Sequence, residues 1–405
     1  MFKKVANLSF IAGITSILNF FLNFILARFY PVEIFAKYGS IFAIVNIAAI
    51  LTTVGYESLI LRFTDESSFV GLLRSSLISF FLASTLVFVS SVFVFVYYYN
   101  VDFYESLIWS TLGPFLGISA LRVSYYVNSN LQYRAQLLEK LLKTILCVFF
   151  ISVNLYFFGS ESSLGISLSF FCANILVLFI SSFFIGKRIS KTTGGDGTDF
   201  IWPNWALFFI ALVVVLQANL DVLLLSKLES EINLALFLVA QKLAIASNIV
   251  ILTVNTVLVP YVLKSNVESE IKKNLNIGLY ISIFASLVFL STCFLFGRNI
   301  LTLFGPEYVE ADNVLNFIAL NMLISVIFGQ TFTLMKTWGY EKYLLLFITI
   351  SILLKISITI IFHEYFSLIH YVIVSIFCTF LWNLLCLIYL KVKTGINPSI
   401  FRMWN

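Results

Sequence analysis

The sequence predicts an all-α membrane protein of about twelve transmembrane helices. Hydrophobic residues make up 60% of the 405 residues and charged residues only 11%, whereas soluble domains average roughly 45–50% and 25%. The apolar runs are continuous over roughly 20 residues, which is the length that a bilayer-spanning helix needs. Strands of an outer-membrane barrel would instead alternate over about ten residues. These observations exclude a soluble globule and a barrel.

The predicted spans follow one another with short connections. The first follows Lys3 and Lys4 and ends at Arg28 without a small-residue cleavage site, so we interpret it as a retained helix and not as a signal peptide. The twelve predicted spans are residues 8–29, 38–61, 75–99, 106–127, 141–158, 164–185, 205–225, 234–262, 277–296, 314–334, 343–362 and 367–390.

The positive charges are distributed unevenly between the two sides of the predicted membrane. Of the 25 lysines and arginines, 19 fall on the side of the two termini, four fall in the opposite loops and two fall within spans. Because cytoplasmic loops carry the excess of Lys and Arg, we expect both termini in the cytoplasm. A missed helix would mix the charges of all later loops, so the asymmetry also supports the number of spans.

Two features divide the chain into halves of six spans. The longest connection contains KTTGGDGTD (191–199), whose composition is typical of a flexible linker, although an ordinary cytoplasmic loop explains it equally well. The segment 25–38 resembles 224–237 at an offset of 199 residues. Such internal symmetry is common in transporters, whose substrate path lies between the halves. We therefore predict an N-terminal lobe (1–190), a linker (191–204) and a C-terminal lobe (205–405) around a central cavity.

Charged and polar side chains within the spans are the candidate functional residues. An ionisable group in hydrocarbon costs roughly 2.5–3.5 kcal/mol on insertion scales, so it normally faces the bundle interior or a water-filled cavity. Lys355 lies about 12 residues into its span, near the bilayer midplane at roughly 1.5 Å per residue, and is expected to line a cavity. Many uncharged residues of this kind only form hydrogen bonds between helices. The uncharged candidates are Gln217, Gln241 and Asn248.

Two readings remain open for the other charged residues. Asp221 and Lys242 lie on opposite sides of one hairpin, where they either form a structural ion pair or leave Asp221 to bind and release a coupling cation. Arg28, Arg122 and Glu57 lie near the predicted interfaces, where snorkelling explains them as well as a cavity does.

The balance of these charges indicates the class of cargo. The four cations Arg28, Arg122, Lys242 and Lys355 outnumber Glu57 and Asp221, and cations that line a cavity suit an anionic ligand such as a phosphate. This balance predicts an anionic substrate.

Signatures of enzymes and of metal sites are missing from the sequence. It contains no Walker loop, zinc helix motif or nucleophile elbow, and its five cysteines lie in apolar runs without metal-ligand spacing. The predicted outer loops, mostly about 5–18 residues long, are too short to build an acid/base site or an ATPase domain. We therefore expect a secondary transporter that is not an enzyme, with no cofactor, no metal and no nucleic-acid partner.

Three segments resemble the Wzx-type O-antigen and polysaccharide flippases, which form a branch of the multidrug/oligosaccharidyl-lipid/polysaccharide (MOP) exporter superfamily. The first, ILARFYPVEIFAKYGSIFAI (25–44), is similar to the family's pattern between its first two helices. The second and third, NLDVLLLSKLESEINLALFLVAQKL (219–243) and LFGPEYVEADNVLNFIAL (303–320), are similar to its seventh-to-eighth hairpin and to the loop before its tenth helix.

The resemblance implies a flippase that moves an undecaprenyl-pyrophosphate-linked oligosaccharide across the bacterial inner membrane. It implies alternating access of two six-helix lobes, driven by a proton or sodium gradient, and a polysaccharide polymerase and a chain-length regulator as partners besides the membrane lipids. On this basis Lys355, Lys242 and Arg122 are expected to contact the pyrophosphate and sugars, Arg28 to form an outer gate, and Asp221 to couple the cycle to the ion.

Two alternatives remain. A multidrug or small-molecule antiporter of the same superfamily would favour acidic pockets for cationic drugs, against the cationic balance found here. A membrane O-antigen polymerase would need a long outer loop, which the predicted spans do not leave room for.

Overall fold

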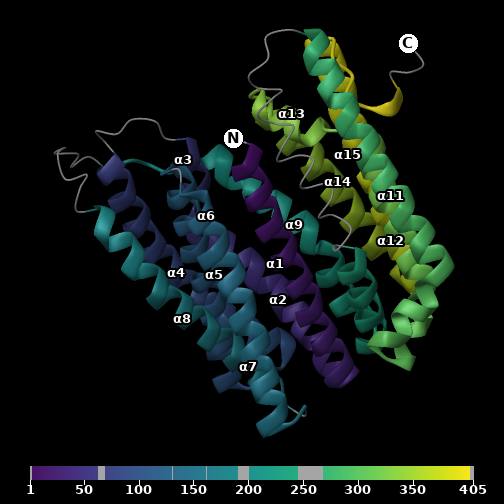
Figure 1. Ribbon diagram of the computed structural model, residues 1–405. Coiled ribbons are helices and arrows are strands. Elements are labelled where there is room, and N and C mark those ends of the chain that lie inside the picture. The colour runs from purple at the N-terminus through teal and green to yellow at the C-terminus, as the bar shows by residue number, and fades with distance from the viewer. Residues whose placement is uncertain are drawn as a thin grey trace. The chain divides into compact units, whose positions relative to one another are not determined.

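The computed structural model describes residues 2–62, 69–129, 131–160, 162–189, 200–244 and 268–401 (Figure 1). Helices joined by short connections make up nearly all of these residues, and none of the described residues lies in a strand. The predicted all-α fold class is therefore confirmed.

The described residues divide into two compact units, Met1–Asn219 and Leu220–Asn405, and the boundary falls inside α9. The predicted lobes place the division earlier, at the 191–204 linker, most of which lies outside the described residues, so that boundary stays a prediction. The N-terminal unit contains α1 (Phe2–Phe29), α2 (Val32–Thr53), α3 (Tyr56–Arg62), α4 (Phe69–Tyr99), α5 (Phe103–Asn128), α6 (Gln132–Arg134), the π-helix η1 (Ala135–Leu142), α7 (Lys143–Phe158), α8 (Ser163–Ile189) and the first part of α9 (Trp205–Leu228).

The C-terminal unit begins with the end of α9 and a helical segment at 231–244. Its remaining elements are α11 (Glu268–Phe304), the 3₁₀ turn η2 (Pro306–Ala311), α12 (Asp312–Ile327), α13 (Thr331–Thr337), α14 (Glu341–Phe362), the 3₁₀ turn η3 (His363–Tyr365) and α15 (Leu368–Thr394). In this unit α11 packs on α12, and both α12 and α14 pack on α15 (Figure 1).

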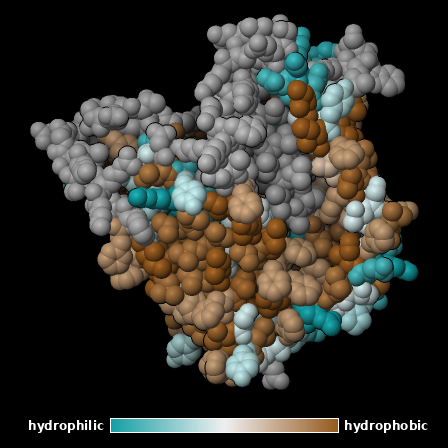
Figure 2. Space-filling view, in the orientation of Figure 1, coloured by the Kyte–Doolittle hydropathy of each residue, from teal (hydrophilic) through white to brown (hydrophobic). Residues whose placement is uncertain are grey.

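Eleven helical segments in the described part of the chain are long and apolar enough to cross a bilayer. The predicted span at 234–262 is helical over 231–244, and its remainder lies outside the described residues. Figure 2 shows hydrophobic residues over most of the visible described surface. On α4, for example, Phe81, Leu86 and Phe93 are all exposed. Large apolar side chains on the outside of a helical bundle are lipid-facing, so this is a multi-pass membrane protein.

Small residues let the helices of the N-terminal unit approach closely. Gly113 and Gly117 of α5 lie against Ala48 and Thr52 of α2, so that a β-carbon at either glycine would collide with those side chains. Lipid tails are as apolar as the helices, so the hydrophobic effect does not drive helices together in a membrane. Their association relies on close van der Waals packing instead. The α2–α5 contact is therefore a close-packed centre of this unit.

The structure corrects two of the predicted spans, which are interrupted. The span predicted at 38–61 ends as α2 at Thr53 and resumes as α3 after Val54 and Gly55, which have φ of 48° and 82°. The span predicted at 314–334 stops at Ile327, and α13 begins only at Thr331. A hydropathy average does not detect these interruptions, because most residues in the two turns are also apolar. The helix ends there because the backbone adopts a positive φ.

The second of these interruptions depends on Gly329. Its φ is +69°, and a β-carbon there would meet the backbone carbonyl of Pro398. Gly329→Ala is therefore expected to destabilise the protein by about 1–3 kcal/mol, seen as a lower melting temperature of the purified protein in detergent. Gly339→Ala is the matched control, because Gly339 also has positive φ (+80°) but open space around it. Equal melting temperatures for the two variants would contradict the role of this contact.

Candidate functional site

Among the described residues of the C-terminal unit, the most buried charged side chain is that of Lys355, which forms an ion pair between α14 and α9. The Lys355 Nζ lies 2.5 Å from the Asp221 Oδ1, and the Ser375 Oγ of α15 donates a hydrogen bond of 2.7 Å to the same oxygen. The side chain of Lys355 is only 8% exposed, whereas that of Asp221 is 18% exposed. The pair is thus buried on the lysine side and partly accessible on the carboxylate side.

Lys355 belongs to a polar stripe on the buried face of α14. Ser351 and Thr359, one turn to either side, are both buried, and the Ser351 Oγ donates to the Cys378 carbonyl oxygen at 3.0 Å. Their spacing of four residues puts these three residues on one face of a helix, and the structure turns that face toward α15. This stripe brings the ammonium group to the partner carboxylate.

The structure pairs Asp221 with Lys355, although its neighbour across the hairpin is Lys242. The face of α9 that carries Asp221 meets α14 and α15, as the contacts to Lys355 and Ser375 show. Lys242 is half-buried on the segment 231–244, and it has no carboxylate partner within the part of the chain that the structure describes. A hairpin brings residues near each other, but the rotation of each helix decides which side chains meet.

A second buried ion pair lies in the N-terminal unit, between α5 and η1. The Arg122 Nε is 3.0 Å from the Glu139 Oε1, and the Arg122 Nη2 donates to Oε2 at 3.1 Å. Ser119 and Ser181 each donate to the same carboxylate, at 2.8 Å and 2.6 Å. The Arg122 Nη1 also donates to the Leu178 carbonyl oxygen at 3.3 Å. Both charges are therefore neutralised and extensively hydrogen-bonded inside the unit.

Sequence reasoning missed Glu139. The fifth span was predicted to start at residue 141, which left Glu139 in a cytoplasmic loop, whereas the helical run extends back through η1 to Ala135. Glu139 is 1% exposed. The signal that could have found it is the amphipathic sequence AQLLEKLL (135–142), whose leucines continue the following span toward its N-terminus.

The other predicted site residues lie on other elements or other turns of the chain. Arg28 is exposed in the last turn of α1, and Glu57 is half-buried in the first turn of α3. Gln217 is half-buried one turn before Asp221, and Gln241 is half-buried on 231–244. Asn248 lies outside the described residues. The roles expected for these residues stay predictions.

The described residues contain no group of three or more His, Cys, Asp or Glu side chains that could hold a metal ion. In both pairs, a positive and a negative side chain neutralise each other, and serine hydroxyls donate hydrogen bonds to the carboxylate. Such groups bind ions or exchange partners, and the C-terminal pair has the more accessible carboxylate.

Comparisons with known proteins agree with this architecture. Residues 1–266 match the family model described as polysaccharide biosynthesis protein. Among curated protein sequences, none matches this chain.

Three solved structures illustrate the shared fold. An inward-facing multidrug resistance MATE family transporter of the MOP superfamily is 15% identical with a TM-score of 0.69, and the match covers 94% of this chain and 96% of that one. The lipid II flippase MurJ in an inward closed conformation is also 15% identical with a TM-score of 0.69, covering 95% and 87%. A MOP superfamily transporter from Pyrococcus furiosus is 16% identical with a TM-score of 0.66, covering 96% of each chain.

These similarities to solved structures concern the fold, whereas the family match covers well over half of the chain. The chain thus shares the fold of these solved structures. This chain belongs to the polysaccharide biosynthesis protein family.

Proposed function

We propose that this protein is a flippase for an undecaprenyl-pyrophosphate-linked oligosaccharide, an O-antigen or capsule repeat unit. It moves this cargo across the bacterial inner membrane by alternating access, with both termini in the cytoplasm. The observation that carries the proposal is the match of residues 1–266 to the polysaccharide biosynthesis family. A chain of this family that consists of membrane-spanning helices is suited to move a lipid-linked saccharide, and a lipid II flippase shares the fold.

In this proposal the Asp221–Lys355 pair is the element that responds to the cargo. A pyrophosphate is an anion that competes with the Asp221 carboxylate for the Lys355 ammonium group. Because Asp221 is the more exposed partner, the cargo reaches the pair from the carboxylate side. Lys242 is the second expected contact, since its charge is not paired with a carboxylate of the described residues. Arg122 is able to contact an anion only after it separates from Glu139.

The same exchange gives a route to coupling. Once Lys355 binds the pyrophosphate, Asp221 is left as an unpaired carboxylate in a poorly solvated position, which is costly. Uptake of a proton or a sodium ion offsets that cost, and release of the cargo restores the ion pair. Cargo binding and ion binding are then linked, because both depend on the separation of one pair.

The proposal is tested by mass spectrometry of undecaprenyl-linked glycans from a strain that lacks this protein, combined with an assay of the leaflet that holds them. We expect complete repeat units trapped in the cytoplasmic leaflet, and complementation by the wild-type chain should release them. Units that accumulate in the outer leaflet would favour a polymerase. No accumulation at all would refute the flippase.

The second candidate is a multidrug antiporter, favoured by the structural similarity to MATE transporters. It predicts that the same deletion strain becomes sensitive to cationic dyes while its undecaprenyl-linked glycans stay unchanged. The two candidates therefore give opposite results in one strain.

A further inference from the structure

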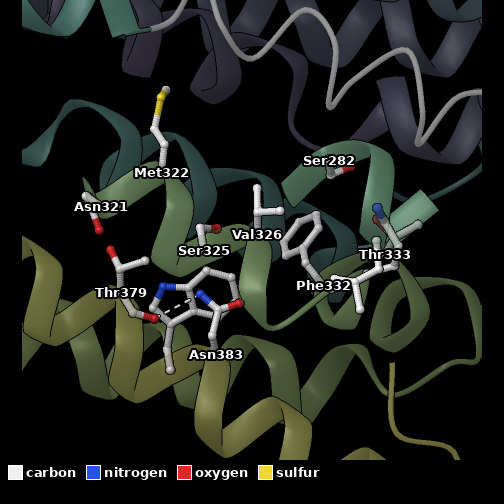
Figure 3. Close-up of a pocket in the computed structure, with 13 residues that line it drawn as sticks. Ser282, Asn321, Met322, Ser325, Val326, Phe332, Thr333, Thr379 and Asn383 are labelled. Carbon is white, nitrogen blue, oxygen red and sulfur yellow. Dashed lines mark hydrogen bonds between the residues drawn. The ribbon is translucent and has the colours of Figure 1, made fainter. Parts of the chain in front are cut away.

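We infer that a polar cavity inside the C-terminal unit binds one uncharged sugar ring of the cargo. This inference rests on the proposed function and adds a saccharide site to it. The cavity has a volume of about 310 Å³ and is lined by residues of α11, α12, α13 and α15 and of the turn between α12 and α13. Figure 3 shows Asn321, Ser325, Thr379 and Asn383 on one side of it and Ser282 with Thr333 on the other.

The lining of the cavity has the chemistry of a sugar site. Its polar side chains are amides and hydroxyls, which together donate and accept hydrogen bonds as sugar hydroxyls require. Trp382 and Phe332 add flat apolar surfaces on which a sugar ring can lie. None of the lining residues carries a charge. A pyrophosphate or a cationic drug would therefore find no counter-charge here, whereas an uncharged ring needs none.

Three polar atoms in this lining have no hydrogen-bond partner within the part of the chain that the structure describes. They are the Ser282 Oγ, the Asn321 Oδ1 and the Trp382 Nε1, all of them buried. Ser282 is 2% exposed and Trp382 is 8% exposed. Most buried polar atoms in proteins are paired, because an unpaired one costs free energy. Three unpaired atoms around one cavity point to a ligand that supplies hydroxyl groups.

The break between α12 and α13 supports a binding role for the same cavity. Gly329 and Gln330 of this break line it. Interrupted helices form the substrate sites of many transporters. The cavity volume lies near the lower end of roughly 300–1,000 Å³ for small-molecule sites, which suits one ring and not the whole oligosaccharide.

One face of α15 joins this cavity to the ion pair. Ser375, which bonds to Asp221, lies one turn before Thr379, and Asn383 follows one turn later. At 1.5 Å per residue, the ion-pair contact and the cavity are separated by about 6 Å along the helix. A single cargo can therefore place its pyrophosphate at Lys355 and a sugar ring in the cavity.

The test uses the full-length protein in lipid nanodiscs and ligand-observed NMR with methyl glycosides of neutral hexoses, N-acetylhexosamines and 6-deoxyhexoses. Glucuronic acid is the charged comparator. At least one neutral glycoside should bind, and glucuronic acid should not. Binding of none of the glycosides, or equal binding of glucuronic acid, would overturn the inference.

Substitutions of the unpaired atoms make the test specific to this cavity. Asn321→Leu should weaken glycoside binding about tenfold while the melting temperature stays equal or rises, because an unpaired buried atom is removed. Asn316→Leu is the matched control, since Asn316 lies on the same helix with an unpaired buried Oδ1 but does not line the cavity. It should leave binding unchanged. Equal binding by both variants would place the sugar elsewhere.

This experiment is independent of transport. If no glycoside binds while the deletion strain traps repeat units in the cytoplasmic leaflet, the sugar site is wrong and the flippase stands. If glycosides bind but no repeat units are trapped, the cavity is a sugar site in a protein of another function.

Discussion

Glu139→Ala is expected to lower the free energy of unfolding by about 3–5 kcal/mol, because it leaves the buried Arg122 guanidinium without its counter-charge. The same change removes the acceptor of the hydrogen bonds from Ser119 and Ser181. The measurement is the thermal unfolding of the full-length protein in detergent, together with its abundance in the membrane. We expect a large loss of folded protein at the growth temperature.

Two variants test whether the loss of stability comes from the unpaired Arg122 guanidinium and not from the removal of a glutamate as such. Glu33→Ala removes an exposed glutamate of the same unit and should leave the melting temperature unchanged. The double variant Arg122→Leu/Glu139→Leu should recover much of the lost stability, because an apolar pair often replaces a buried ion pair at little cost. A Glu139→Ala protein that unfolds like the wild type would show that Arg122 does not depend on this carboxylate.

Lys355→Ala is expected to stop flipping, provided that the proposed function holds. A hydrogen bond to a charged group contributes about 1.5–3 kcal/mol, so loss of the pyrophosphate contact should weaken cargo binding roughly ten- to hundredfold. The variant also leaves the Asp221 carboxylate without its ion-pair partner. Surface polysaccharide should fall to the level of the deletion strain, measured alongside the amount of folded protein.

The double variant Asp221→Asn/Lys355→Gln removes both charges and therefore leaves no stranded charge in the membrane. It should accumulate as folded protein and still fail to flip, because neither the cargo contact nor the coupling group remains. Full transport by this neutral variant would refute the coupling role of the pair. Unchanged surface polysaccharide in both Lys355→Ala and Lys242→Ala would refute the cargo contacts.

The helices of this protein were predictable because membrane spans are long apolar runs. The interruptions at Gly55 and Gly329 were not, since each depends on a positive φ and on a close backbone or side-chain contact, with Phe208 and Pro398 respectively. Hydropathy carries no information about such contacts. Local turns therefore had to come from the structure.

The candidate site was predictable in part. The depth of Lys355 and Asp221 within their spans identified both as unusual, but their pairing depends on the rotation of α9 toward α14 and α15. The cavity went unnoticed because residues such as Asn321 and Ser282 are uncharged and of types that are common in helix contacts. Only their convergence from separate helices makes them a site.

The π-helical segment Ala135–Leu142 bears on how the length of this span can change in evolution. A π turn accommodates one residue more than an α turn, and each residue of a helix rotates the chain by about 100°. Deleting a single residue here would restore a regular α-helix and leave the register of α7 intact. It would also rotate Glu139 away from Arg122. The span can thus lose one residue without breaking the membrane helix, and the ion pair is what such a deletion would alter.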